Sequence, residues 1–198
     1  MARRVGPKLV FGDQPYGFTG DGTSEGVIAL TPADIARFYA DRYGPQDSAL
    51  LLVGDLTRAE AEGLAQKYFG KWSSQTTPEA RIPSPPPPQP TRIVIVDKAG
   101  APQTALYAFG LGVRKSSPDT DILDVMNYSL GDSFSSRLNM NLREVHGYAY
   151  GAWSSFLEYR AGGEFLAGGL VRTDVTAAAA KELMAEIRNF PARDTRMK

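Results

Sequence analysis

The sequence contains no cysteine and only one histidine, His146, among its 198 residues. The missing thiols exclude disulfides, thiolate nucleophiles and cysteine-ligated zinc sites. Most catalytic zinc sites use two or three imidazoles, so one histidine is too few for a tight catalytic metal. We therefore expect no metal and no other cofactor to be held by this chain alone.

The sequence also lacks a charge imbalance and long apolar runs. Lys+Arg and Asp+Glu number 22 each, and the formal net charge is zero at pH 7. No broad basic surface is therefore expected to attract nucleic acid or anionic lipid. Runs such as "ALLLV" at 49–53 are too short to span a bilayer, and the first residues lack the apolar stretch of a signal peptide. We expect neither nucleic acid nor a membrane as a partner.

Half of the 14 prolines lie in residues 73–90, "SSQTTPEARIPSPPPPQP". Proline holds such a segment in extended polyproline II, a semi-rigid spacer of about 3 Å per residue. The composition therefore predicts a linker between two parts, residues 1–72 and residues 91–198.

The part before the linker looks incomplete. Its first thirty residues are rich in glycine and turn formers, which predicts an irregular segment. Helices are predicted over 32–43 and 58–69, because Thr31 and Thr57 can cap them, and a buried strand is predicted over 48–56. A single strand cannot form a stable sheet, so the missing strands must come from elsewhere, and open edges predict self-association.

The part after the linker predicts an α+β fold, with helices covering one face of a mostly antiparallel sheet. Strands are expected over 91–98, 103–113, 148–159 and 163–173, and helices over 118–132, 133–147 and 174–189. Two apolar stripes are expected to face the core: Ile122, Val125, Met126 and Leu130 on one helix, and Phe134, Leu138, Leu142 and Val145 on the next.

The helix-to-strand corner "LREVHGYAYG" at 142–151 carries the strongest functional signal. Arg143 is nine residues after Phe134, about half a turn around a helix from it, and so faces away from the core. Strand periodicity puts Tyr148, Tyr150 and Ala152 on one face. Two interpretations stay open: a surface ion pair beside half-buried tyrosines, or a polar clamp for a carbonyl and an oxyanion. For His146, a capping or surface role is favoured over catalysis.

The sequence around this corner resembles that of a known protein family. "LGDSFSSRLNMNLREVHGYAYGAWSSF" at 130–156 is similar to a segment of the insulinase/pitrilysin zinc metallopeptidases, the inverzincins, except that Asp132 replaces a glycine. "QPYGFTGDGTSEG" and "LLLVGDL" also resemble the end of the family's zinc-bearing domain, with Gln14 where the family has a histidine. The family's H-x-x-E-H zinc motif is absent from this sequence.

The resemblance implies a LuxS/mitochondrial-processing-peptidase-like fold and a central fragment of such an enzyme. Residues 1–72 would be the C-terminal part of the first, zinc-type domain, and 91–198 the N-terminal part of the second, substrate-clamping domain. In the family, an arginine and a tyrosine seven residues apart help to hold substrate and transition state. These match Arg143, as the substrate-binding residue, and Tyr150, as the catalytic residue, whereas Tyr148 matches a packing position.

Two functions follow from the resemblance. The first is a fragment of a zinc-dependent metalloendopeptidase that acts on a peptide substrate and is inactive alone, with zinc supplied by the complete enzyme. The second is a non-catalytic partner or scaffold subunit of the same family. In either case the partners are the remaining parts of the peptidase or a catalytic partner subunit. Similarity to exported bacterial relatives implies a periplasmic parent, although the residues themselves leave the compartment open.

Zinc titration tests the expected lack of a metal site. Because the chain has one histidine and no cysteine, isothermal calorimetry with Zn²⁺ should reveal no stoichiometric high-affinity site. The zinc-treated chain should likewise hydrolyse no peptide. Tight one-to-one binding, or hydrolysis that a chelator stops, would contradict this expectation.

Overall fold

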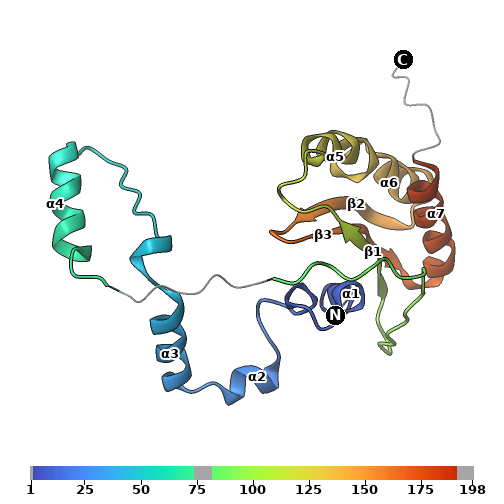
Figure 1. The fold of residues 1–198 in the computed structure, drawn as a ribbon. Coiled ribbons are helices and arrows are strands. Elements are labelled where there is room, and N and C mark those ends of the chain that lie inside the picture. Colours follow the sequence, from blue (N-terminus) through green and yellow to red (C-terminus); the bar gives the residue numbers. More distant parts are fainter. Residues whose placement is uncertain (1, 74–81, 191–198) are drawn as a thin grey trace. The chain divides into compact units, whose positions relative to one another are not determined.

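The structure is a computed structural model that describes residues 2–73 and 82–190 (Figure 1). The described chain forms two compact units: residues 2–20 with 82–190 make the larger one, and residues 21–73 make the smaller one. The predicted linker at 73–90 lies partly outside the described residues, and residues 82–90 have no regular secondary structure. The predicted domains, 1–72 and 91–198, stay predictions.

The larger unit is built on a three-stranded antiparallel sheet in the order β1-β3-β2. The strands are β1 (Gln103–Gly112), β2 (Ala149–Glu158) and β3 (Gly163–Arg172). A short turn joins β2 to β3, and β3 pairs along its whole length with β1. These three strands confirm the sequence prediction, and the antiparallel sheet with its helices confirms the α+β class.

Helices cover one face of this sheet (Figure 1). They are α5 (Thr120–Asn127), α6 (Arg137–Asn139) and α7 (Thr176–Asn189), with π-helical turns at Tyr128–Asp132 and Met140–Val145. A buried cluster joins the two layers, and burying each of its leucines stabilises the fold by about 1.5–3 kcal/mol. The cluster consists of Leu130, Leu138, Leu142, Ala152, Ala167, Val171, Ala179, Leu183 and Phe190.

The opposite face of the sheet is covered by α1 (Ala2–Phe11), so the prediction of an irregular N-terminal segment is wrong there (Figure 1). Gly6 and Pro7 both disfavour a helix locally, which hid it from the sequence pattern. Packing compensates: Gly6 lies against the Phe109 ring, where a β-carbon would clash, and the Arg3 guanidinium lies 5.0 Å from the Trp153 ring. Tertiary contacts therefore determine this helix.

The smaller unit contains α2 (Ser24–Ala29), α3 (Pro32–Arg42) and α4 (Arg58–Phe69). Thr31 and Thr57 cap α3 and α4 through reciprocal hydrogen bonds with the third residue of each helix. Both helices confirm the sequence prediction, whereas α2 lies within the segment predicted to be irregular. No helix among the described residues is long and apolar enough to cross a membrane.

Two predicted strands, 48–56 and 91–98, belong to no sheet among the described residues. Neither segment has regular secondary structure, and residues 54–55 form a bend. Val53 is 88% exposed, and Ile93 and Ile95 are 89% and 87% exposed. A strand is stable only when a neighbour satisfies its backbone groups. The strands predicted at 48–56 and 91–98 are therefore not formed by the described residues, because no neighbouring strand there supplies hydrogen-bond partners.

A buried carboxyl lies beneath the N-terminal segment. Glu164 of β3 is 2% exposed, and the Tyr159 hydroxyl donates to its Oε2 at 3.4 Å. Tyr159 in turn stacks on Tyr16, and both rings contact Phe11. Burial raises the pKa of Glu164 above its ordinary value near 4.5, which the hydrogen bond from Tyr159 partly offsets. The folded state therefore favours the protonated carboxyl.

Replacing Glu164 by glutamine should flatten the pH dependence of stability. Because the folded-state pKa of Glu164 is raised, its contribution to stability is fully present below about pH 4.5 and is lost as pH rises through the folded-state pKa. Urea denaturation between about pH 4 and pH 8 should show a smaller fall for Glu164→Gln. The exposed Glu62 offers a control, since Glu62→Gln should keep the wild-type slope. An unchanged slope in Glu164→Gln would contradict the assignment.

Candidate functional site

The candidate site is the corner where the helix through Arg137–Val145 meets β2. Gly147 ends the helix with φ +60°, a conformation that glycine adopts without strain. The N–H groups of Gly147 and Tyr148 donate to the carbonyls of Arg143 and Leu142 at 3.0 and 2.8 Å. These bonds satisfy the last helical carbonyls and turn the chain directly into the strand.

The structure brings both predicted site residues together at this corner. The Arg143 guanidinium lies 5.1 Å from the ring centroid of Tyr150 and 4.8 Å from that of Phe134. Tyr150 is 85% exposed and Phe134 is 66% exposed. Arg143 also pairs with Glu144, at 3.1 Å from Nε to Oε1. An arginine between two aromatic rings is thus presented at the surface; we call these three side chains the Arg143 stack.

Phe134 was missed by the sequence prediction, which assigned it to a buried stripe and put Arg143 half a turn away from it. Leu138 and Leu142 are indeed buried, but Phe134 and Val145 are exposed. The cause is the helix start: α6 begins at Arg137, after Ser136, so Phe134 precedes the helix. The π-helical turn that follows also shifts the residue spacing around the axis, which removes Val145 from the buried face.

The stripe predicted for the preceding helix is only partly correct. Leu130 is buried and Met126 packs against the core, whereas Ile122 and Val125 are 66% and 75% exposed. Ile122 and Val125 lie within α5, before the π-helical turn at Tyr128–Asp132, so they belong to a part of the helix surface that this unit does not cover.

A β-bulge orients Tyr150. On β3, Val171 and Gly169 pair with Ala149 and Ala152 of β2, so β2 has one residue more than its partner between these pairs. The two alanines consequently both pack toward the core. The prediction that Tyr148, Tyr150 and Ala152 share a face is therefore wrong. The extra residue breaks the alternation and leaves Tyr150 outside the core.

Asn139 holds the two sides of the corner together. This asparagine is 5% exposed; its Oδ1 accepts from the Ala152 N–H at 3.2 Å and its Nδ2 donates to the Phe134 carbonyl at 2.7 Å. One side chain thus fixes both the strand after the bulge and the segment that carries Phe134. Asn127 makes a similar connection to Ser154 deeper in the helix layer.

His146 lies beside the stack rather than in it. Its imidazole stacks on Tyr148 with ring centroids 4.9 Å apart, and its Nε2 is 3.8 Å from Glu182 Oε2. Asn141 donates to Glu182 and to Glu186, so these groups join the helix before Gly147 to α7. Within residues 2–73 and 82–190, no three His, Cys, Asp or Glu side chains gather in a way that could hold a metal ion.

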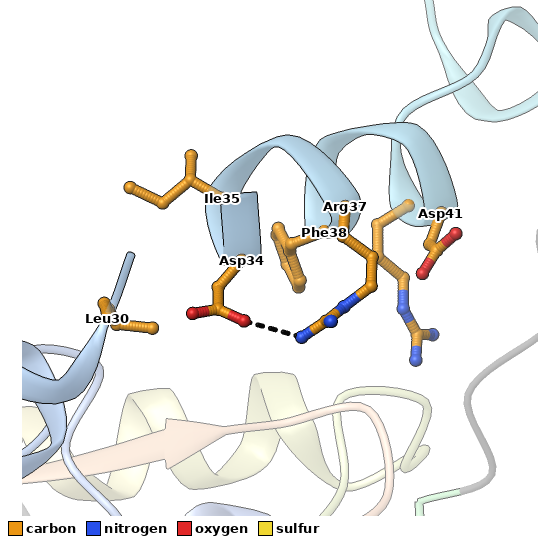
Figure 2. A pocket seen from close by; sticks show the side chains of 7 residues that line it. Leu30, Asp34, Ile35, Arg37, Phe38 and Asp41 are labelled. Carbon is orange, nitrogen blue, oxygen red and sulfur yellow. Dashed lines mark hydrogen bonds and ion pairs between the residues drawn. The ribbon is translucent and has the colours of Figure 1, made fainter. Parts of the chain in front are cut away.

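A surface hollow of about 500 Å³ lies along α3 in the smaller unit, and Figure 2 shows the residues that line it. Leu30, Ile35 and Phe38 supply its apolar lining, and Asp34 pairs with Arg37 at 2.7 Å. Hydrogen bonds from Thr31 in the helix cap lower the pKa of Asp34. Asp34 and Arg37 are thus engaged by the cap and by each other, and Asp41 and Arg42 complete the lining.

Comparisons with known proteins place this geometry in context. The family model described as "Peptidase M16 inactive domain" matches residues 29–193. An uncharacterised zinc protease of Mycobacterium leprae is 30% identical over 154 residues, which are 74% of this chain and 33% of that protein. Zinc protease PqqE of Helicobacter pylori is 30% identical over 162 residues, which are 78% of this chain and 36% of that protein. The chain thus spans about a third of the length of the curated relatives it matches.

Solved structures agree with the sequence comparisons. A peptidase M16 inactive domain from Pseudomonas fluorescens superimposes with a TM-score of 0.87 at 26% identity, covering 97% of this chain and 46% of that chain. A protease from Helicobacter pylori shares the fold, with a TM-score of 0.76 at 24% identity, covering 90% of this chain and 44% of that one. The predicted resemblance to the zinc metallopeptidases is confirmed.

Removing the Asn139 side chain should destabilise the corner. Asn139→Ala deletes two hydrogen bonds and leaves a buried N–H of Ala152 without its acceptor, so the free energy of unfolding should fall by about 1–3 kcal/mol in urea denaturation. Ser135→Ala, an exposed change in the same segment, should stay within about 0.5 kcal/mol of the wild type. Equal stabilities of Asn139→Ala and wild type would refute the role of Asn139.

Proposed function

Because the chain belongs to the peptidase M16 inactive-domain family, we propose that it supplies substrate binding and transition-state stabilisation to a zinc-dependent peptidase. Arg143 is the substrate-binding residue and Tyr150 is the catalytic residue in this proposal. The observation that supports it most is the Arg143 stack, in which the guanidinium lies 5.1 Å from the ring of an exposed tyrosine.

The environment of Arg143 suits a carbonyl or carboxylate ligand. Glu144 engages the Nε side of the guanidinium, which leaves the two Nη groups to donate in the plane of the group. Contact with two rings restricts that plane, so less side-chain freedom is lost when a ligand binds. An extended peptide would therefore be held by hydrogen bonds from Arg143 to its backbone oxygen.

The hydroxyl of Tyr150 is the group proposed to act on the reacting atoms. The tyrosine is 85% exposed, so its phenol is accessible to a peptide bound at Arg143. A neutral phenol donates a hydrogen bond to the carbonyl oxygen as negative charge develops on it. Removal of one such donor typically lowers kcat by about 10²–10³-fold.

Zinc, which the names of the relatives imply for the family, does not fit the described residues. His146 has one carboxylate nearby, Glu182 at 3.8 Å, and an imidazole with one carboxylate is too few ligands for a catalytic zinc. The proposal therefore assigns the metal to residues outside this chain. The partners are the remaining parts of the peptidase or a catalytic partner subunit.

The domain assignment belongs to the same proposal. Residues 1–72 would complete the first, zinc-type domain, and residues 91–198 would form part of the second, substrate-clamping domain, with 73–90 between them. The extended, exposed segments at 48–56 and 91–98 support this, because each is an apolar strand former whose pairing partner must be supplied from elsewhere.

A second candidate function is that of a non-catalytic partner or scaffold subunit. The family model's own description, an inactive domain, favours it. In that case the exposed apolar segments would carry the function by protein–protein contact, and the Arg143 stack would be dispensable for catalysis. The two candidates are distinguished by the kinetics of point variants in the assembled peptidase.

In the complete peptidase, Tyr150→Phe should lower kcat by about 10²-fold with little change in KM, because it removes an interaction made mainly in the transition state. Arg143→Gln should lower kcat/KM through a higher KM, because it removes a contact to bound substrate. Steady-state hydrolysis of a quenched fluorescent peptide measures both constants.

Tyr128→Phe is the matched control, since Tyr128 is another exposed tyrosine on the larger unit, at 62% exposure; it should leave kcat and KM unchanged. If both site variants keep wild-type kinetics while the chain remains necessary for assembly, the scaffold function replaces the catalytic one.

A further inference from the structure

Phe134 is the member of the Arg143 stack to which neither the sequence pattern nor the resemblance assigned a functional role. Its ring is 66% exposed and lies beside the two proposed site residues, Arg143 and Tyr150. One contact is known: the Arg143 guanidinium, 4.8 Å from the ring centroid. The exposed remainder of the ring is accessible to a ligand.

The position of this ring is fixed by its own backbone. The Phe134 carbonyl accepts a hydrogen bond from the buried Asn139 side chain at 2.7 Å, and the next helix starts three residues later, at Arg137. The guanidinium further restricts the ring by stacking on it. Because little freedom remains to be lost, an apolar group that packs on Phe134 keeps most of the free energy of its burial.

The charges around the ring favour an uncharged side chain. A basic side chain would approach the Arg143 guanidinium, and like charges repel each other. An acidic side chain would compete with the peptide carbonyl for the same guanidinium donors, and would also approach the carboxylate of Glu144. A large apolar or aromatic side chain is neither repelled by these charges nor competes for the guanidinium donors, and it can pack on the exposed ring.

We propose that Phe134 is a specificity-determining residue, which binds a large apolar side chain of the peptide whose backbone carbonyl is held by Arg143. This inference rests on the proposed function, since it needs a peptide at Arg143. It adds a preference for a large apolar side chain in that peptide, which Arg143 and Tyr150 do not provide. The ligand class is a peptide with an apolar or aromatic residue beside the bound carbonyl.

The test uses two fluorescently labelled peptides that differ at one central position, phenylalanine in one and serine in the other, with glycine, serine and threonine elsewhere. Fluorescence anisotropy with the full chain should give about tenfold tighter binding of the phenylalanine peptide, from partial burial of one aromatic side chain. Phe134→Ala should bring the ratio of the two dissociation constants close to one. Phe134→Leu, which retains an apolar surface, should keep an intermediate ratio.

Ile122→Ala is the matched control, because Ile122 has the same exposed fraction as Phe134, 66%, and lies on α5 of the same unit; it should preserve the tenfold ratio. Circular dichroism of each variant verifies folding. If Phe134→Ala weakens both peptides by the same factor, the ring acts only by holding Arg143 and the inference is overturned.

Arg143→Gln separates the inference from the proposed function. It should weaken both peptides by a similar factor, because the contact to the backbone carbonyl is common to them. If Arg143→Gln changes neither affinity, or if the wild type binds neither peptide, the proposed function fails and the inference with it. If Arg143→Gln weakens both peptides while Phe134→Ala keeps the tenfold ratio, only the inference fails.

Discussion

The one extra residue of β2 between its pairs with Val171 and Gly169 is the constraint on which the corner depends. It lets two small residues, Ala149 and Ala152, both pack toward the helix layer. The extra residue also interrupts the alternation of side chains between the two faces of the sheet at Tyr150. A large ring can therefore lie outside the core without a break in the sheet. Asn139 stabilises this arrangement by accepting the hydrogen bond from Ala152.

The Arg143 stack has a defined geometry but little net charge. The chain has no net charge, and the charges at the corner are also balanced, since Glu144 accompanies Arg143. In the proposed function such a surface selects its ligand by contact, through hydrogen bonds in the guanidinium plane and through the faces of two rings. These are contacts that an uncharged peptide backbone and an apolar side chain can make together.

Much of the fold could be predicted from sequence, and three of the failures share one physical cause. The strands of the sheet, the capped helices α3 and α4, and α7 follow from local patterns that their surroundings reinforce. The helix α1 could not be predicted, because Gly6 and Pro7 oppose it locally and packing against Phe109 compensates. The segments 48–56 and 91–98 have strand-forming sequences but no partner among the described residues. Non-local contacts decide all three cases.

The site shows the same division. The proximity of Arg143 and Tyr150 could be predicted from the sequence of the corner. The contact between Phe134 and Arg143 could not, because their spacing of nine residues puts them on opposite sides of a helix if one regular helix contains both. The sequence does contain a usable signal, since "SFSS" offers several possible N-caps, and a helix that starts at the last serine places Phe134 before it. Local spacing alone cannot decide among these starts.

The segment Ile93–Val96 has a consequence for handling the protein. Four consecutive β-branched residues, each about half exposed or more and part of no sheet, offer an apolar ribbon to any similar chain nearby. Arg92 stands before this ribbon and Asp97 and Lys98 follow it, and flanking charges of this kind act as gatekeepers against amyloid-like stacking. We expect these flanking charges to oppose association of the segment at high protein concentration, and added salt, which screens them, to favour it.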